Sequence, residues 1–148
     1  MAGRAEILIN APKEKVWKII TDIENSADNI SGIEKIEVLE KPDHGFVGFK
    51  WEETRKMFGQ SATEIMLITD AVENKYYKTR AEHPNVVYIS TLSLEEKNGS
   101  TLLSMGFEAE ALNLWTKIMS AVMGIFINKS MKKTLHQDLE DIKTTLEG

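Results

Sequence analysis

The stretch AEILINAPKEKVWKIITDI, residues 5–23, decides how the fold begins. Apolar side chains alternate at Ala5, Ile7 and Ile9, which predicts a strand with one buried face. Pro12 suits the start of a helix, because the amide donor that proline lacks would be unpaired there. The apolar residues that follow at helical spacing predict a first short helix, and they are Val16, Ile19, Ile20 and Ile23. A second short helix or turn is expected within residues 22–30.

Strand periodicity returns after this segment and continues from about residue 33 to residue 111. Pro42 to Gly45 has the composition of a turn, and Asn98-Gly99 is a strong signal for a two-residue hairpin turn. With the opening strand, the pattern predicts about seven strands. Because short turns join most of them, we expect an antiparallel sheet.

The chain closes with one helical run from Leu112 to Leu146, whose two halves differ. The second half carries a single narrow apolar stripe, formed by Leu135, Leu139, Ile142 and Leu146. Charged residues that include Asp138, Glu140 and Asp141 are interpreted as a solvated face. The first half is apolar almost all the way round, which predicts burial on more than one side. The order of elements therefore indicates an α+β domain in which a curved sheet holds a long helix, with room for an apolar ligand between them.

Strand and helix parity select the residues that we expect to line such a cavity. Phe49 and Trp51 share one face of their strand with Val47, and Met105 and Phe107 share one face of the last strand. Tyr88 is a possible cavity hydroxyl, although an ordinary strand aromatic explains it better. The first half of the final helix adds Trp115, Met119, Val122, Met123 and Phe126.

Glu53 and Arg55 are the best candidates for catalysis. They follow Phe49 and Trp51 at every second position, so an unbroken strand would point all four side chains to the same face. A buried carboxylate beside a guanidinium could orient a ligand carbonyl or move a proton. The alternative, which we favour, is that the strand leaves the core after Trp51 and that both side chains reach solvent.

Composition excludes several classes of function. The chain has 148 residues, enough for one domain spanning 1–148, and a formal net charge of −5 that argues against nucleic-acid binding. Its lack of cysteine excludes disulfides, thiolate catalysis and thiolate metal sites. The N-terminus has no apolar signal core, so we expect a cytoplasmic protein. The longest apolar run, Ala121 to Ile127, is too short for a transmembrane segment.

Metal and cofactor sites are not indicated either. His44, His83 and His136 lie in separate predicted elements without ligand spacing, so we predict no metal. The sequence has no glycine-rich phosphate cradle, nucleophile elbow or Walker pattern, and no cofactor is predicted.

The opening ILINAPKEKVW, residues 7–17, followed by Thr21-Asp22, resembles the start of START-like, helix-grip (SRPBCC) proteins, in particular the polyketide cyclase/dehydrase branch. The resemblance extends over essentially the whole chain. It implies a seven-stranded curved antiparallel sheet wrapped around the C-terminal helix, with two short helices after the first strand and a largely apolar cavity. Members of this group bind lipids, sterols, polyketides or hormones, and a minority catalyse cyclisation or dehydration. No catalytic motif is shared across the group, so none can be transferred to this chain.

Three functions follow as hypotheses. The first is binding of a small lipophilic molecule by a carrier or sensor. The second is a cyclase or dehydratase without metal, which needs a cavity acid or base, and Glu53 is the best candidate. The third is a module that binds a protein partner through the apolar segment from Trp115 to Ile127. The sequence does not determine the oligomeric state.

Overall fold

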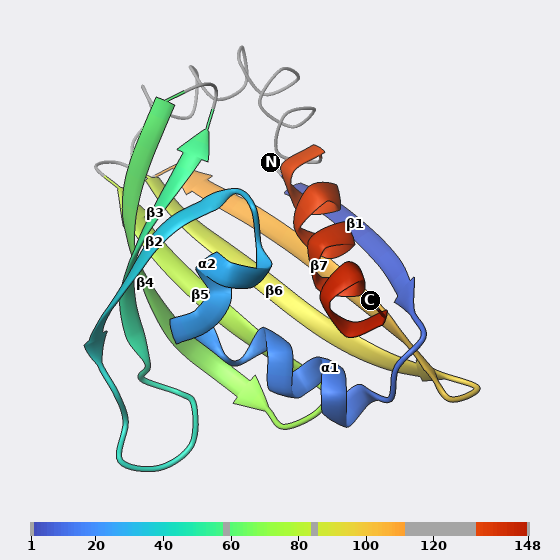
Figure 1. The fold of residues 1–148 in the computed structure, drawn as a ribbon. Coiled ribbons are helices and arrows are strands. Elements are labelled where there is room, and N and C mark those ends of the chain that lie inside the picture. The colour runs from blue at the N-terminus through green and yellow to red at the C-terminus, as the bar shows by residue number, and fades with distance from the viewer. Residues whose placement is uncertain (1, 58–59, 84–85, 112–132, 148) are drawn as a thin grey trace.

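The computed structural model describes residues 2–57, 60–83, 86–111 and 133–147. These residues form a seven-stranded antiparallel sheet in the order β1-β7-β6-β5-β4-β3-β2. The strands are β1 (Ala2–Ile9), β2 (Ile33–Glu40), β3 (Lys50–Met57), β4 (Gln60–Val72), β5 (Tyr76–His83), β6 (Val86–Lys97) and β7 (Ser100–Ala111). The helices are α1 (Lys13–Ile20), the 3-10 helix η1 (Ile23–Asn25), α2 (Ser26–Asn29) and a C-terminal helix at 133–147. The predicted curved sheet and the two short helices after the first strand are confirmed (Figure 1).

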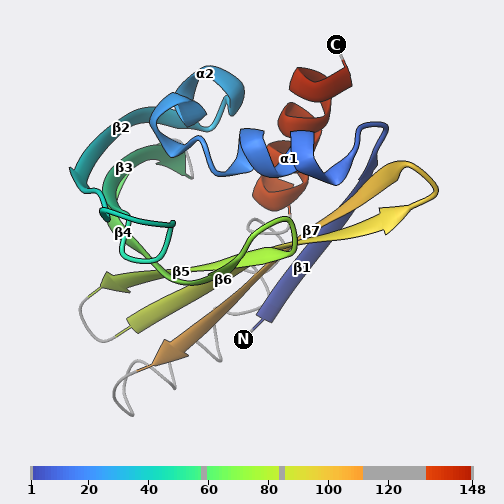
Figure 2. The same ribbon diagram turned by 90° about the horizontal axis from the view of Figure 1, so that it is seen from below.

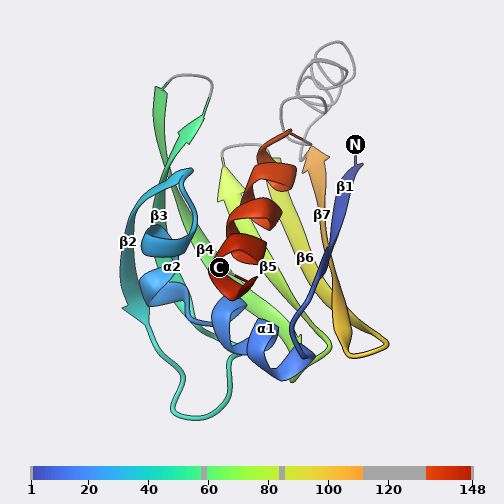
Figure 3. The same cartoon turned by 45° about the vertical axis from the view of Figure 1, so that its right-hand side comes forward.

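The path of the chain brings the helices of the described residues to one face of the sheet. β1 pairs with β7, whereas β2 forms the opposite edge next to β3. The segment with α1, η1 and α2 therefore crosses from one edge to the other. Figures 2 and 3 show this segment and the C-terminal helix, in red, on the same side of the curved sheet.

Two hairpin details test the predicted turns. Asn98 and Gly99 have φ values of 51° and 87°, as a two-residue turn with both central residues left-handed requires, so the predicted β6–β7 hairpin is confirmed. The turn before β3 differs from the expectation. Val47 was expected to share the buried face of Phe49, but it is 48% exposed because the strand begins only at Lys50. Positive φ values at Gly45 and Gly48 bend the backbone before that point.

The core lies between the helices and the concave face of the sheet. Val16 and Ile20 of α1 are buried against it, and the C-terminal helix contributes its predicted stripe, with Leu139 fully enclosed. Each such aliphatic side chain contributes about 1.5–3 kcal/mol through burial.

Two polar contacts fix the C-terminal helix at its solvent side. A carboxylate oxygen of Asp141 accepts hydrogen bonds from the backbone amide and the hydroxyl of Ser31, at 2.9 and 2.8 Å. Lys143 donates from Nζ to the backbone carbonyl of Leu8 at 2.8 Å. These contacts attach the helix to the segment after α2 and to β1, so the apolar stripe between them faces the sheet.

No helix in the described part of the chain is long and apolar enough to span a membrane.

Candidate functional site

A cavity of about 290 Å³ lies between the concave face of the sheet, the α1–α2 segment and the C-terminal helix. Most of its wall is apolar. The helical side is made largely of aliphatic residues, which are Ile19, Ile20, Ile23, Ile30, Leu135 and Ile142. The sheet contributes Ile33, Trp51, Met66, Ala81, Leu92, Met105 and Phe107. The volume is close to the lower end of the range for small-molecule sites, roughly 300–1,000 Å³.

Strand alternation explains which sheet residues reach the cavity. On β5 the cavity residues are Tyr77, Thr79 and Ala81, so Arg80 points to the other face and pairs there with Glu82. On β6 the same alternation of side chains brings Tyr88, Ser90 and Leu92 to the cavity. Cross-strand register aligns these sets, because Thr79 is opposite Ser90 and Ser90 is opposite Phe107. The sheet wall therefore carries the hydroxyl groups of Thr79 and Ser90 on neighbouring strands, followed by the ring of Phe107.

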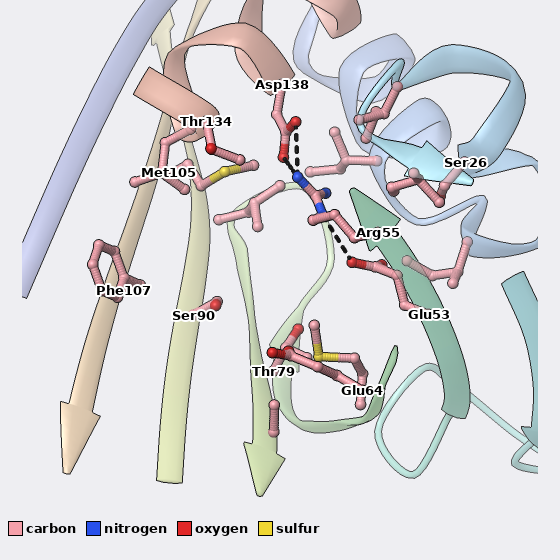
Figure 4. Close-up of a pocket in the computed structure, with 18 of the residues that line it drawn as sticks. Ser26, Glu53, Arg55, Glu64, Thr79, Ser90, Met105, Phe107, Thr134 and Asp138 are labelled. Atoms are coloured by element: carbon pink, nitrogen blue, oxygen red, sulfur yellow. Dashed lines mark hydrogen bonds and ion pairs between the residues drawn. The ribbon is translucent and has the colours of Figure 1, made fainter. Parts of the chain in front are cut away.

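Arg55 of β3 is held between two carboxylates at the helical end of the cavity (Figure 4). Its Nε donates to Oε2 of Glu53 at 3.3 Å. Its Nη1 donates to Oδ1 of Asp138 at 3.1 Å and lies 3.0 Å from Oδ2 of the same carboxylate. Because Asp138 belongs to the C-terminal helix, this group connects the helix to the sheet. We call Glu53, Arg55 and Asp138 the ionic triad.

All three members of the ionic triad are largely buried. Glu53 is 8% exposed and Asp138 is 4% exposed, and the Arg55 side chain is nearly as enclosed. The favoured expectation that Glu53 and Arg55 reach solvent is therefore wrong, since β3 stays against the cavity beyond Trp51. The interpretation of Asp138 as part of a solvated face is also wrong. Asp138 follows Leu135 by three residues and precedes Ile142 by four, so it lies on the buried face of the helix.

Burial and charge shift the pKa values within the ionic triad in defined directions. Burial raises the pKa of Asp138 to about 6; Arg55 opposes this shift, and the charges of Glu53 and Asp141 add to it. Burial acts to lower the pKa of Arg55, but the charges and hydrogen bonds of Asp138 and Glu53 outweigh it, so the pKa is raised. Arg55 therefore stays cationic, while Asp138 can exchange a proton near neutral pH.

Aromatic residues position the ionic triad from the sheet side. Trp51 donates from Nε1 to Oε1 of Glu53 at 3.3 Å. Phe49 packs against Trp51 with ring centroids 5.8 Å apart, and it is not among the described cavity-lining residues.

Tyr77 donates its hydroxyl proton to the backbone carbonyl of Ile20 at 3.1 Å, which ties the end of α1 to β5. Burial raises the pKa of Tyr77 strongly, with further contributions from Glu53 and Asp138, so this hydroxyl remains protonated.

The structure brings together six of the residues singled out from the sequence. Trp51, Glu53, Arg55, Tyr88, Met105 and Phe107 all lie on the cavity wall. Their contact with a ligand stays a prediction. Trp115, Met119, Val122, Met123 and Phe126 lie outside the described residues.

Other cavity residues were missed in the sequence. Asp138 could have been found from its helical spacing to the predicted apolar stripe. Glu64 shares the parity of Met66 on β4, and Thr79 and Ser90 share the parity of their apolar neighbours. Polar side chains on an apolar strand face give only a weak signal until the register is known. Among the described residues, no group of three or more His, Asp or Glu side chains is placed to hold a metal ion.

Comparison with known proteins identifies the family. Residues 3–147 match the family described as polyketide cyclase / dehydrase and lipid transport. A search of curated protein sequences gave no match.

Solved structures share the fold at low sequence identity. TTHA0849 from Thermus thermophilus superposes with a TM-score of 0.82 and 17% identity, over 99% of this chain and 97% of that chain. A START superfamily protein from Mycobacterium smegmatis gives 0.82 and 19% with the same coverage. The Zhui aromatase/cyclase from Streptomyces sp. R1128 gives 0.77 and 15%, over 99% of this chain and 93% of that chain. These likenesses show the helix-grip fold that the sequence led us to expect. Because the family match spans almost the whole chain, this protein belongs to the polyketide cyclase / dehydrase and lipid transport family.

Proposed function

We propose that this protein binds a small lipophilic molecule in the cavity between the sheet and the helices, as a carrier or sensor. The observation that carries the proposal is the cavity itself, about 290 Å³ in volume and lined mainly by aliphatic and aromatic side chains. Removing apolar ligand surface from water would supply the affinity, at roughly 25 cal/mol per Å². The few polar side chains on the wall would set the orientation of the ligand.

A substitution that fills the cavity distinguishes ligand binding from a purely structural role of the residues that line it. Ala81 lies on the cavity wall and is buried, whereas Lys78 lies on the same strand and is exposed. Ala81→Phe should occupy ligand space, and Lys78→Phe adds the same ring on the solvent side.

The experiment is native mass spectrometry of freshly purified protein and of both variants. We expect wild type and Lys78→Phe to carry a small molecule that is released on denaturation, and Ala81→Phe to carry markedly less. An equal load on all three proteins would contradict binding in this cavity.

A second candidate, a cyclase or dehydratase acting in the same cavity, is favoured by the ionic triad. Asp138 borders the cavity, and its pKa of about 6 lets it hold a proton near neutral pH. In a dehydration, the carbon–oxygen bond would break as Asp138 protonates the departing hydroxyl to give water. In the same step Glu53 would take the proton from the carbon next to the carbonyl, and the electrons of that carbon–hydrogen bond would form the double bond. Incubation with a β-hydroxy ketone tests this: loss of water with wild type but not with Asp138→Asn would support it, and equal rates would reject it.

A further inference from the structure

The charges on the cavity wall restrict the kind of polar group that a ligand can bring into it. Among the described residues that line the cavity, three carry carboxylates and one carries a guanidinium: Glu53, Glu64, Asp138 and Arg55. The formal sum is therefore −2 when all four are ionised. In a wall that is mostly apolar, such charges are screened less than they would be in water.

The positive charge of Arg55 is already engaged within the protein. Its Nε and Nη1 atoms both donate to carboxylates, to Glu53 at 3.3 Å and to Asp138 at 3.1 Å. Separating a buried pair to receive a ligand anion would leave a carboxylate without its partner, which is unfavourable. Two protein carboxylates therefore already surround the guanidinium, and a ligand carboxylate would be a third negative charge beside it.

The remaining acidic residue strengthens this restriction. Glu64 of β4 is directly opposite Glu53 of β3 in the sheet register, and both side chains line the cavity. Side chains directly opposite each other on neighbouring strands lie close together, and two like charges in that position are unfavourable. Figure 4 shows Glu53 beside Arg55 and labels Glu64 on the sheet side of the same cavity.

A carboxylate accepts hydrogen bonds and cannot donate them, and each has about four acceptor positions. The two oxygens of Glu53 receive one protein hydrogen bond each, from Trp51 and from Arg55. Acceptor capacity therefore remains at this wall even with those contacts in place. Burial and the nearby charge of Glu64 also raise the pKa of Tyr88, which keeps another cavity hydroxyl neutral.

From this arrangement we propose that the cavity selects lipophilic molecules whose polar end donates hydrogen bonds and bears no negative charge, and that it rejects fatty-acid-like carboxylates. This inference rests on the proposed binding function and adds the ligand class. The carboxylate of Glu53 receives the donor, and the aliphatic wall covers the remainder of the ligand.

Three probes with one ring system test the selectivity by NMR titration at about pH 7.5, where a free carboxylic acid is ionised. They are naphthalene, 2-naphthol and 2-naphthoate. Naphthalene reports apolar binding alone, and the other two differ from it in the polar group. We expect 2-naphthol to bind about tenfold or more tightly than 2-naphthoate. Comparable affinities would overturn the proposal while leaving the cavity function intact, and failure of all three to bind would overturn both.

Glu64→Gln removes one negative charge at nearly constant shape, and Glu96→Gln removes the same charge from the exposed end of β6. We expect the first to narrow the preference for naphthol over naphthoate by about threefold or more, because a repulsive charge is lost. The second should leave that preference unchanged, and equal responses of the two variants would contradict the proposal.

Discussion

Arg55 of β3 joins the sheet to the C-terminal helix through Asp138, whose two carboxylate oxygens lie 3.1 and 3.0 Å from the Arg55 Nη1 atom. The two residues are 83 positions apart in the chain. Glu53 holds the other side of the guanidinium, so one cation serves two buried carboxylates. This relationship places a titratable group, Asp138, on the wall of a mostly apolar cavity.

Arg55→Met should reduce the free energy of unfolding by about 3–5 kcal/mol, because it leaves two buried carboxylates without their cation. Arg80→Met is the matched control, since Arg80 forms a comparable pair with Glu82 at an exposed position. An exposed pair contributes only about 0–1 kcal/mol. Urea unfolding of both variants is the measurement. Equal losses would mean that the ionic triad does not stabilise the fold beyond an ordinary surface pair.

The pH dependence of stability follows from Asp138. Its pKa rises from an ordinary value near 3.8 to about 6 in the folded protein. Between these values the folded state retains a proton that the unfolded chain has lost. The contribution of Asp138 is therefore fully present below about pH 4 and is lost as the pH rises through about 6. The loss amounts to at most about 3 kcal/mol, because one unit of pKa shift corresponds to about 1.4 kcal/mol.

Asp138→Asn removes this titration, and urea unfolding from about pH 4 to about pH 7 provides the comparison. We expect the stability of wild type relative to Asp138→Asn to fall across that range. Asp43→Asn, in the exposed turn before β3, should keep the wild-type profile. Parallel profiles for wild type and Asp138→Asn would contradict the raised pKa.

Leucine truncation distinguishes filled core from cavity wall. Leu139 is fully buried and is not among the described cavity-lining residues, so Leu139→Ala should cost about 2–5 kcal/mol because it creates a void. Leu92 is also buried but borders the cavity, so Leu92→Ala should cost less, because its side chain already has open space on one side. Leu8→Ala is the surface control, since Leu8 is 51% exposed. Denaturant unfolding measures all three, and a larger loss for Leu92→Ala than for Leu139→Ala would show that the cavity is filled.

Much of the fold could be predicted because it rests on local patterns. The alternation from Ala5 to Ile9, the Asn98-Gly99 turn and the stripe around Leu139 each describe a short segment whose own residues determine its form. Val47 was misplaced because alternation was extended across Gly48, where a positive φ interrupts the strand geometry.

The ionic triad could be predicted only in part. Parity placed Glu53 and Arg55 on the same face as Trp51, but it could not decide whether that face stays buried at the end of the strand. That depends on Asp138, which closes this part of the cavity from a helix far along the chain. The helical spacing of Asp138 to Leu135 was a local sign of burial, but Asp138 was interpreted from its charged neighbours instead. Its pairing with Arg55 leaves no trace in local periodicity.

The central claim, a lipophilic ligand in the cavity, is tested most directly by NMR titration of wild type, Ala81→Phe and Lys78→Phe with naphthalene. The account predicts saturable binding to wild type and to Lys78→Phe, and a dissociation constant at least about tenfold weaker for Ala81→Phe, whose added ring occupies the cavity. Equal affinities for Ala81→Phe and wild type would contradict it, as would absence of saturable binding to wild type.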